Sequence, residues 1–243
     1  MYRPSLTALS LLILAAAPLS SQSKMDHDPD KKADGGALPA GWTGRTDRDN
    51  TKLADAKFVT MGTGFHVTSG PAAIYWKPTN MMAGRFVASA SFTQMKAPTH
   101  PEAYGIFFMG KNLNAPEQSY AYMLVRGDGK VMVKHRAGKE LHTIMDWTDN
   151  AAVVKQDASG KATNTLSVDA SRPDSVRLLV NGKQITAMAD GYMGSAKGFV
   201  GLRVNHNLDV HVADFTVTSK GMAAKAPAKS KARKAAKKAA SQE

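Results

Sequence analysis

The chain has 243 residues, a formal net charge of +12 and an isoelectric point near 9.8, and it contains no cysteine. The lack of cysteine excludes a disulfide framework, thiol catalysis and a cysteine-linked lipid anchor. Half of the net charge lies at the C-terminal end, where seven lysines and arginines from residue 222 onward face one glutamate, so the rest of the chain is only mildly basic.

The first 23 residues have the pattern of a secretory signal peptide. Arg3 supplies a short positive region, the apolar run over residues 8–17 is too short to span a bilayer, and small serines follow it. The alternative is an uncleaved N-terminal anchor. Residues 24–40 are rich in Asp, Lys, Gly and Pro and are predicted to be a solvated linker. We therefore expect a periplasmic or secreted protein with no transmembrane segment after signal removal.

Residues 41–219 are predicted to form a single all-β domain, because short alternating runs are separated by turn residues and no amphipathic helix of three turns interrupts them. The strand 85–93 has small and apolar residues on both faces, which indicates a central position in a sheet. The predicted strands are 57–60, 65–68, 72–76, 85–93, 103–109, 119–126, 130–136, 139–145, 151–154, 164–169, 175–180, 183–188, 198–204 and 208–218.

Two hairpins are marked by their turn residues. Asp128-Gly129 joins the runs 119–126 and 130–136, and Asn181-Gly182 joins 175–180 and 183–188, because both dipeptides adopt positive φ at little steric cost. In the first hairpin, alternation directs Met123, Val125, Val131 and Val133 to one face. The opposite face receives tyrosines and cations: Tyr120, Tyr122, Arg126, Lys134 and Arg136.

Residues 220–243 form an Ala/Lys-rich tail. Charge repulsion opposes a short helix there, so the tail is predicted to be disordered in water. Clustered Lys and Arg bind polyanions with a steep salt dependence, which makes anionic glycans, phospholipid head groups, lipopolysaccharide and extracellular DNA the candidate partners of the tail.

Several segments of the body resemble the concanavalin A-like lectin/glucanase superfamily. They include YGIFF at 104–108, VNG at 180–182 and the stretch from Gly198 to Val217, and the resemblance covers about residues 41–219. Within the superfamily, the chain is most similar to the bacterial secreted branch related to the keto-disaccharide hydrolase domain. The resemblance implies a two-sheet antiparallel jelly-roll sandwich in which one sheet often binds glycans. The Glu-x-Asp-x-Glu catalytic strand of the glucanases is missing, so that activity is not transferred.

The residues themselves favour glycan binding. Tyrosine rings stack on the CH faces of sugars, and Arg and Asn form planar hydrogen bonds with hydroxyls and carboxylates, so the basic character suits anionic glycans. The structural alternative is a solvent-exposed face that uses Tyr for its β propensity. Trp147 is added from a predicted loop, and Arg203 and Asn205 from the strand face opposite Val200, Leu202 and Val204. The candidate ligand-binding residues are Tyr104, Tyr122, Arg126, Arg136, Trp147, Arg203 and Asn205.

Three functions follow from these patterns. The first is a non-catalytic glycan-binding module with no cofactor and no metal, since the spacing of His206, Asp209 and His211 matches no zinc signature. The second is a glycoside hydrolase of the keto-disaccharide type, implied by the resemblance alone. Its acid and base would come from a set that the sequence does not localise: Asp128, Asp146, His135 or His206. The third is an envelope-associated structural protein that binds polyanions through its tail.

Overall fold

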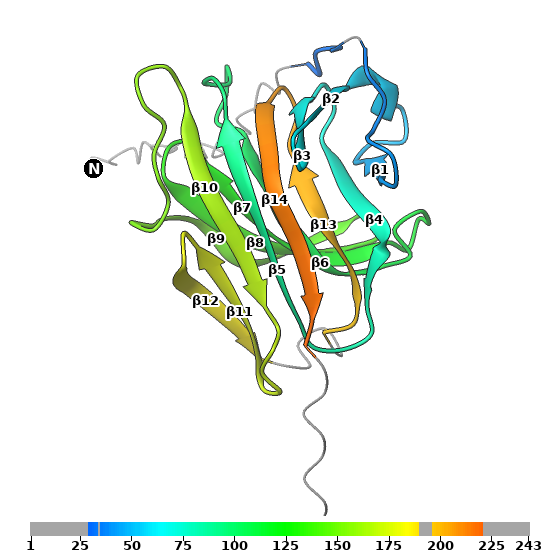
Figure 1. The fold of residues 1–243 in the computed structure, drawn as a ribbon, viewed down its shortest axis with the longest axis vertical. Coiled ribbons are helices and arrows are strands. Elements are labelled where there is room, and N and C mark those ends of the chain that lie inside the picture. The colour runs from blue at the N-terminus through cyan, green and yellow to red at the C-terminus, as the bar shows by residue number, and fades with distance from the viewer. Residues whose placement is uncertain (1–28, 34, 190–195, 221–243) are drawn as a thin grey trace, which may run out of the picture.

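The computed structural model describes residues 29–33, 35–189 and 196–220, so the predicted signal peptide and nearly all of the predicted tail lie outside the described residues. Two seven-stranded antiparallel sheets pack face to face (Figure 1). The first sheet has the order β1-β4-β13-β6-β7-β8-β9, and the second has the order β12-β11-β10-β5-β14-β3-β2. In Figure 1, β10, β5 and β14 lie in front of β8 and β6.

The strands of the first sheet are β1 (Thr43–Thr46), β4 (Ala73–Met82), β6 (Ala103–Lys111), β7 (Ser119–Arg126), β8 (Lys130–Ala137), β9 (Glu140–Asp149) and β13 (Gly198–Val204). Those of the second are β2 (Lys57–Met61), β3 (Gly64–Thr68), β5 (Phe86–Gln94), β10 (Ala162–Asp169), β11 (Ser175–Val180), β12 (Lys183–Ala189) and β14 (Asp209–Ser219). One 3-10 turn, Leu53–Asp55, is the only helical element of the described residues. Within the same residues, no helix is long and apolar enough to cross a membrane.

The predicted all-β, two-sheet antiparallel jelly-roll sandwich is confirmed, but one predicted strand is missing, one strand was not predicted, and β4 and β9 run further than predicted. The predicted strand 151–154 is a turn, because the Asn150 side chain accepts a hydrogen bond from the Ala152 amide at 2.9 Å and the Asn150 carbonyl accepts one from Val153 at 3.0 Å. The apolar side chain of Val153 is buried from that turn. The short polar strand β1 was not predicted, and it is held by pairing with β4.

The core between the sheets follows the predicted alternation. Met123, Val125, Val131 and Val133 are fully buried there. The central position predicted for strand 85–93 is also confirmed, because β5 lies between β10 and β14. Both hairpin turns have the expected backbone, with φ of 93° at Gly129 and 76° at Gly182.

A second apolar cluster covers the outer face of the first sheet, the face turned away from the second sheet. Four rings form a continuous aromatic row across it: Trp76, Phe107, Tyr120 and Tyr122, with successive centroids 6.3, 5.4 and 5.7 Å apart. The Phe107 ring lies over Gly201 of β13, where a Cβ would be only 2.5 Å from the ring. The row is at most 3% exposed, so it forms a rigid floor rather than an open stacking surface.

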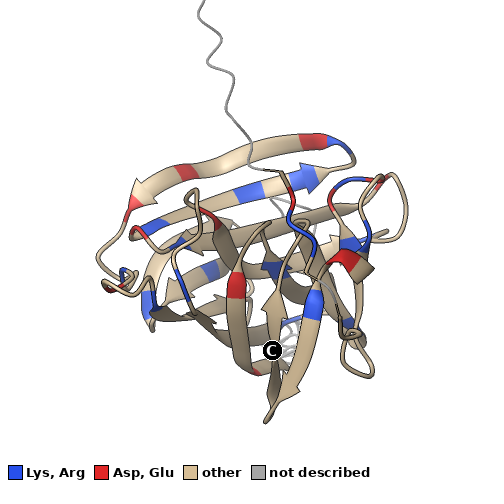
Figure 2. Ribbon diagram, turned by 90° about the horizontal axis from the view of Figure 1, so that it is seen from above, with Lys and Arg blue, Asp and Glu red and all other residues tan. Residues whose placement is uncertain are grey.

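Charged residues are spread around the sandwich. Figure 2 shows basic and acidic residues interspersed along strands and connecting segments, with neither sign confined to one side. A local concentration of charge therefore has to be sought in the side-chain contacts.

Candidate functional site

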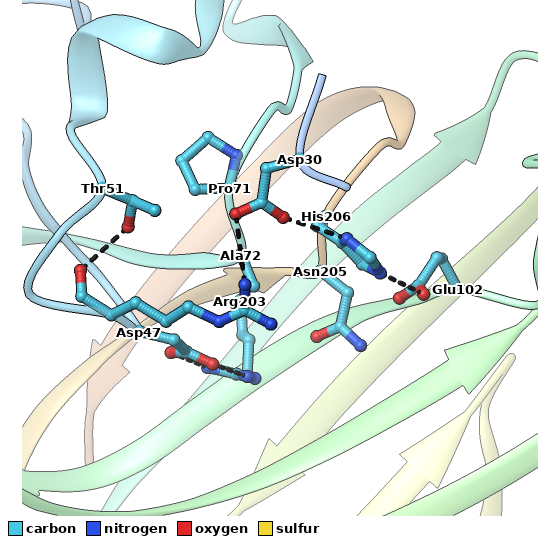
Figure 3. A pocket seen from close by; sticks show the side chains of 10 residues that line it. Asp30, Asp47, Thr51, Pro71, Ala72, Glu102, Arg203, Asn205 and His206 are labelled. Carbon is cyan, nitrogen blue, oxygen red and sulfur yellow. Dashed lines mark hydrogen bonds and ion pairs between the residues drawn. The ribbon is translucent and has the colours of Figure 1, made fainter. Parts of the chain in front are cut away.

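A polar pocket of about 230 Å³ lies at the end of β13 (Figure 3). Ion pairs and hydrogen bonds join most of its charged side chains. Its lining residues are Asp30, Asp47, Arg48, Thr51, Pro71, Ala72, Glu102, Arg203, Asn205 and His206.

Arg203 and Asp47 form the base of this pocket. The Arg203 Nη1 atom donates to Asp47 Oδ1 at 2.8 Å, and Nη2 donates to Oδ2 at 2.5 Å. Nη1 also donates to the Tyr120 hydroxyl at 3.2 Å, and the guanidinium lies 4.9 Å from the Tyr122 ring centroid. Arg203 is only 6% exposed, so its planar guanidinium is held in place by the Asp47 carboxylate and by the aromatic row beneath it.

The protonation states at the base follow from burial and charge. Burial alone would raise the pKa of Asp47, but the coulombic attraction and hydrogen bonds of Arg203, with Arg136 and Arg48 further away, lower it below its usual value. Burial raises the pKa of Tyr120 to about 12. At neutral pH the base therefore holds an ion pair beside a neutral phenol.

His206 forms one wall and lies between two carboxylates. Its Nε2 atom is 2.6 Å from Glu102 Oε1 and its Nδ1 atom is 3.0 Å from Asp30 Oδ1. Arg48 lies 3.8 Å from the other oxygen of Asp30. The hydrogen bond to Glu102 is the largest influence that raises the pKa of His206, and it outweighs burial, which lowers it.

The His206 contacts predict a pH-dependent stability. Because the pKa of His206 is raised in the folded state, its contribution is fully present below the unfolded pKa of about 6.5 and is lost as pH rises through the folded pKa. We expect the free energy of unfolding, measured by urea titration at pH 5.5, 7 and 8.5, to fall across this range. His206→Asn should remove that fall, and an unchanged pH profile in the variant would contradict the assignment.

Asp30 belongs to the segment predicted as a solvated linker, and the structure places part of that segment against the sandwich. The Lys31 amide donates to Asn207 Oδ1 at 2.7 Å, and Asn207 Nδ2 donates to the Pro29 carbonyl at 3.1 Å. The Ala33 amide donates to the Asp55 carbonyl at 2.9 Å. The segment has no helix or strand in its described residues, yet it supplies a wall of the pocket.

Asn205 has unused hydrogen-bonding capacity at the pocket, as does the buried Nε atom of Arg203. The Asn205 backbone amide donates to the Ala103 carbonyl at 2.9 Å, whereas its Oδ1 atom is buried and has no hydrogen-bond partner among the described residues. A buried amide oxygen without a partner costs free energy that a ligand donor could recover.

The structure brings four of the seven predicted site residues together. Arg203 and Asn205 line the pocket, Tyr122 lies beneath Arg203, and Arg136 reaches to 3.8 Å from Asp47 Oδ2. Arg203 lies on the face of β13 opposite Val200 and Leu202, because its guanidinium lies against the Tyr122 ring while these two side chains pack between the sheets. Asn205 follows the end of β13.

Tyr104 lies on the other face, and its predicted position is wrong. It pairs in register with Val125 rather than with Tyr122, is fully buried between the sheets, and accepts a hydrogen bond from Asn164 at 3.2 Å. The sequence does not reveal the face of Tyr104, because β6 is buried on both faces and shows no alternation of apolar and polar residues.

Arg126 and Trp147 form a separate pair. The Arg126 guanidinium lies 4.5 Å from the Trp147 ring centroid and is bonded to Asp128 within the turn, and neither residue lines the pocket. The loop predicted around Trp147 is also wrong, because β9 continues through it to Asp149.

The four acid and base candidates do not converge. Asp128 pairs with Arg126, Asp146 accepts from the Trp147 amide at 2.8 Å, and the ring of His135 stacks on His142, so only His206 lies in the pocket. Among the described residues, no group of three or more His, Cys, Asp or Glu side chains is placed to hold a metal ion.

Four charged pocket residues were missed from the sequence, together with Thr51, Pro71 and Ala72. Asp47 and Arg48 belong to the charged run Arg45–Asp49, which follows an apparent domain start and shows no strand pattern. Asp30 and Glu102 lie in polar segments without periodicity. The density of opposite charges in the run 45–49 is the one local signal that could have indicated a site.

No protein-family model matches this chain, and no curated protein matches it. Among solved structures it is similar to sheep galectin-11 in complex with glycerol, with 10% identity, 67% of this chain and 95% of that one covered, and a TM-score of 0.39. It is also similar to a Caenorhabditis elegans galectin, LEC-6, with 12% identity, 69% of this chain and 99% of that one covered, and a TM-score of 0.41. The potassium-bound carbohydrate recognition domain of Emp46p is 8% identical, with 75% of this chain and 90% of that one covered and a TM-score of 0.49. The proposed keto-disaccharide branch has no match among these findings, and identities this low assign no function.

Proposed function

We propose that this chain is an exported, non-catalytic glycan-binding module whose ligand enters the pocket at the end of β13. The observation that carries the proposal is the joint placement of a fixed guanidinium, Arg203, and an unpartnered amide, Asn205, in one small polar pocket. A pocket of about 230 Å³ suits one sugar residue better than a larger apolar ligand, since drug-sized sites are roughly 300–1,000 Å³.

The side chains of the pocket match the chemistry of a sugar. Each sugar hydroxyl both donates and accepts, and the pocket offers guanidinium donors from Arg48 and Arg203, carboxylate acceptors from Asp47 and Glu102, and an amide that can do either. The aromatic row contributes by holding Arg203 in place, because the rings are buried and present no open stacking surface.

A substitution at Asn205 tests the proposal. We expect Asn205→Ala to weaken glycan retention by about tenfold or more, because the loss of one buried ligand hydrogen bond costs about 1–3 kcal/mol. Its melting temperature should stay close to wild type, since its Oδ1 makes no hydrogen bond within the described residues. The measurement is a glycan array at physiological salt followed by titration calorimetry on each glycan that binds.

Asn114→Ala is the matched control, because Asn114 is exposed and does not line the pocket. Equal retention by wild type and Asn205→Ala would contradict binding at this pocket. A variant that ends at Lys220 separates the body from the tail. Binding that disappears with the tail, and that falls with salt, would support the alternative of polyanion capture by residues 221–243.

A hydrolase is the second candidate, and one observation favours it. Three carboxylates, Asp30, Asp47 and Glu102, line the same pocket as His206, so groups able to transfer protons meet where a sugar would bind. Turnover of a disaccharide that Glu102→Gln abolishes would support the hydrolase, whereas retention without turnover by both proteins would support the binding module.

A further inference from the structure

A second pocket, of about 320 Å³, adjoins the first on the outer side of the first sheet. The two pockets share Asp47 and Arg48 as lining residues, so a ligand of two sugar residues could extend from one into the other. The second pocket is lined by Arg45, Asp47, Arg48, Asp49, Pro116, Gln118, Arg136, Gly138 and Lys139.

The side chains that line the second pocket carry a net positive charge, whereas those of the first pocket carry nearly equal positive and negative charge. Four cations, Arg45, Arg48, Arg136 and Lys139, line it together with only two carboxylates. Asp47 is already engaged by both terminal nitrogens of Arg203, and the Asp49 side chain is 92% exposed and lies 3.9 Å from Arg45. Arg48 also lies 3.8 Å from Asp30 of the first pocket, and Arg136 shares Asp47 with Arg203, so the uncompensated positive charge of the second pocket rests mainly on Lys139 and Arg136.

The cations differ in how firmly they are held. Arg45 donates to the carbonyls of Leu113 and Ala115 at 3.0 and 2.6 Å, which fixes the segment after β6 along the pocket. The Arg136 side chain is 12% exposed and turns toward Asp47. Lys139 has no ion-pair partner among the described residues and can move to meet a ligand.

Gln118 provides an independent indication that the pocket takes a ligand. This residue is 5% exposed, and its backbone is satisfied by Ala115 and Gly138. Its side-chain amide, in contrast, forms no hydrogen bond within the described part of the chain. The amide atoms of Gln118 remain accessible to solvent, and an accessible amide donor beside several cations is suited to an anionic oxygen that accepts from both.

We infer that the second pocket is an anion subsite, and that the ligand is an acidic disaccharide whose hexuronic acid carboxylate enters it. This inference rests on the proposed function, because the first pocket would hold the neighbouring sugar. A carboxylate matches the planar fork of Arg136, and the amide of Gln118 can donate to its second oxygen. A charge-assisted hydrogen bond is roughly twice as strong as a neutral one, so the anion would contribute much of the selectivity.

The test compares matched ligands on the full chain. Titration calorimetry at 0.15 M salt uses disaccharides that carry one hexuronic acid, each paired with its neutral methyl ester. We expect the free acid to bind at least about tenfold more tightly than the ester. Lys139→Gln and Gln118→Leu should each weaken binding of the acid several-fold and leave binding of the ester unchanged, and Lys111→Gln, an exposed lysine outside both pockets, should change neither.

Each outcome bears on one claim. Equal affinity for acid and ester, with binding still lost in Asn205→Ala, would overturn the anion subsite while the proposed function stands. Tighter binding of a sulfated disaccharide than of the carboxylated one would overturn the choice of carboxylate. Binding of neither acid nor ester would overturn the subsite together with the binding module.

Discussion

Replacing Asp47 with alanine is expected to lower the free energy of unfolding by about 3 kcal/mol, because it leaves the Arg203 guanidinium buried without its carboxylate. The penalty is large because both terminal nitrogens of Arg203 donate to Asp47. Solvent screening limits it to about this value, because the Asp47 side chain is 21% exposed. Urea unfolding at pH 7 measures the change. Asp49→Ala is the control, because its side chain is 92% exposed and its loss should cost under about 0.5 kcal/mol.

The same variant should change the acid limb of the stability profile. The pKa of Asp47 is lowered in the folded state, so the ion pair stabilises the protein above the unfolded pKa of about 3.9 and is lost as pH falls through the folded pKa. Wild type should therefore lose stability below about pH 4 more steeply than Asp47→Ala. Parallel acid profiles, or equal losses in the variants at residues 47 and 49, would contradict a buried pair.

Gly201→Ala is expected to destabilise the chain by about 3 kcal/mol, because the position has no space for a methyl group. A Cβ there would lie 2.2 Å from the Tyr75 carbonyl oxygen and 2.5 Å from the Phe107 ring. The backbone oxygen belongs to the paired strand β4 and cannot move without disturbing the pairing of β13. The aromatic row and Arg203, two residues further along β13, should shift with it.

The matched control is Gly84→Ala, where a Cβ would meet nothing within 4 Å and stability should change by less than about 0.5 kcal/mol. Thermal unfolding measures the loss of stability, and near-ultraviolet circular dichroism measures the change in the packing of the aromatic row. We expect Gly201→Ala to lose both stability and aromatic signal. A variant with wild-type stability would show that β13 can relax around the added methyl.

The architecture was predictable because it depends on local alternation. A turn dipeptide between two alternating runs predicts each hairpin, at Gly129 and at Gly182. Small and apolar residues on both faces predict the central position of β5 in its sheet. The alternation of apolar and polar residues gave the wrong face for Tyr104 because this alternation is absent from β6. Every residue of β6 up to Gly110 is buried, so nothing in its sequence distinguishes the face of Tyr104 from that of Phe107.

The pocket was only half predictable, and the reason is its connectivity. Arg203 and Asn205 lie at the end of a recognisable strand, whereas Asp47 is 156 residues away and Asp30 is 176 residues from His206. No periodicity links segments so distant, and polar loops gain their positions from the sandwich that they contact. Tyr120 and Tyr122 lie on the predicted sheet face, but they hold Arg203 in place and present no open stacking surface, and Tyr104 lies on the opposite face.

Strand β9 affects how readily the protein aggregates. It forms an edge of the first sheet, runs for ten residues and is mostly exposed. A long exposed edge is a template onto which a strand of another molecule can add. β9 carries Glu140, Asp146 and Asp149, so a second copy of β9 approaching it would bring like charges together. The edge thus opposes self-association at neutral pH, and screening or neutralising those carboxylates would make fibrous assembly easier.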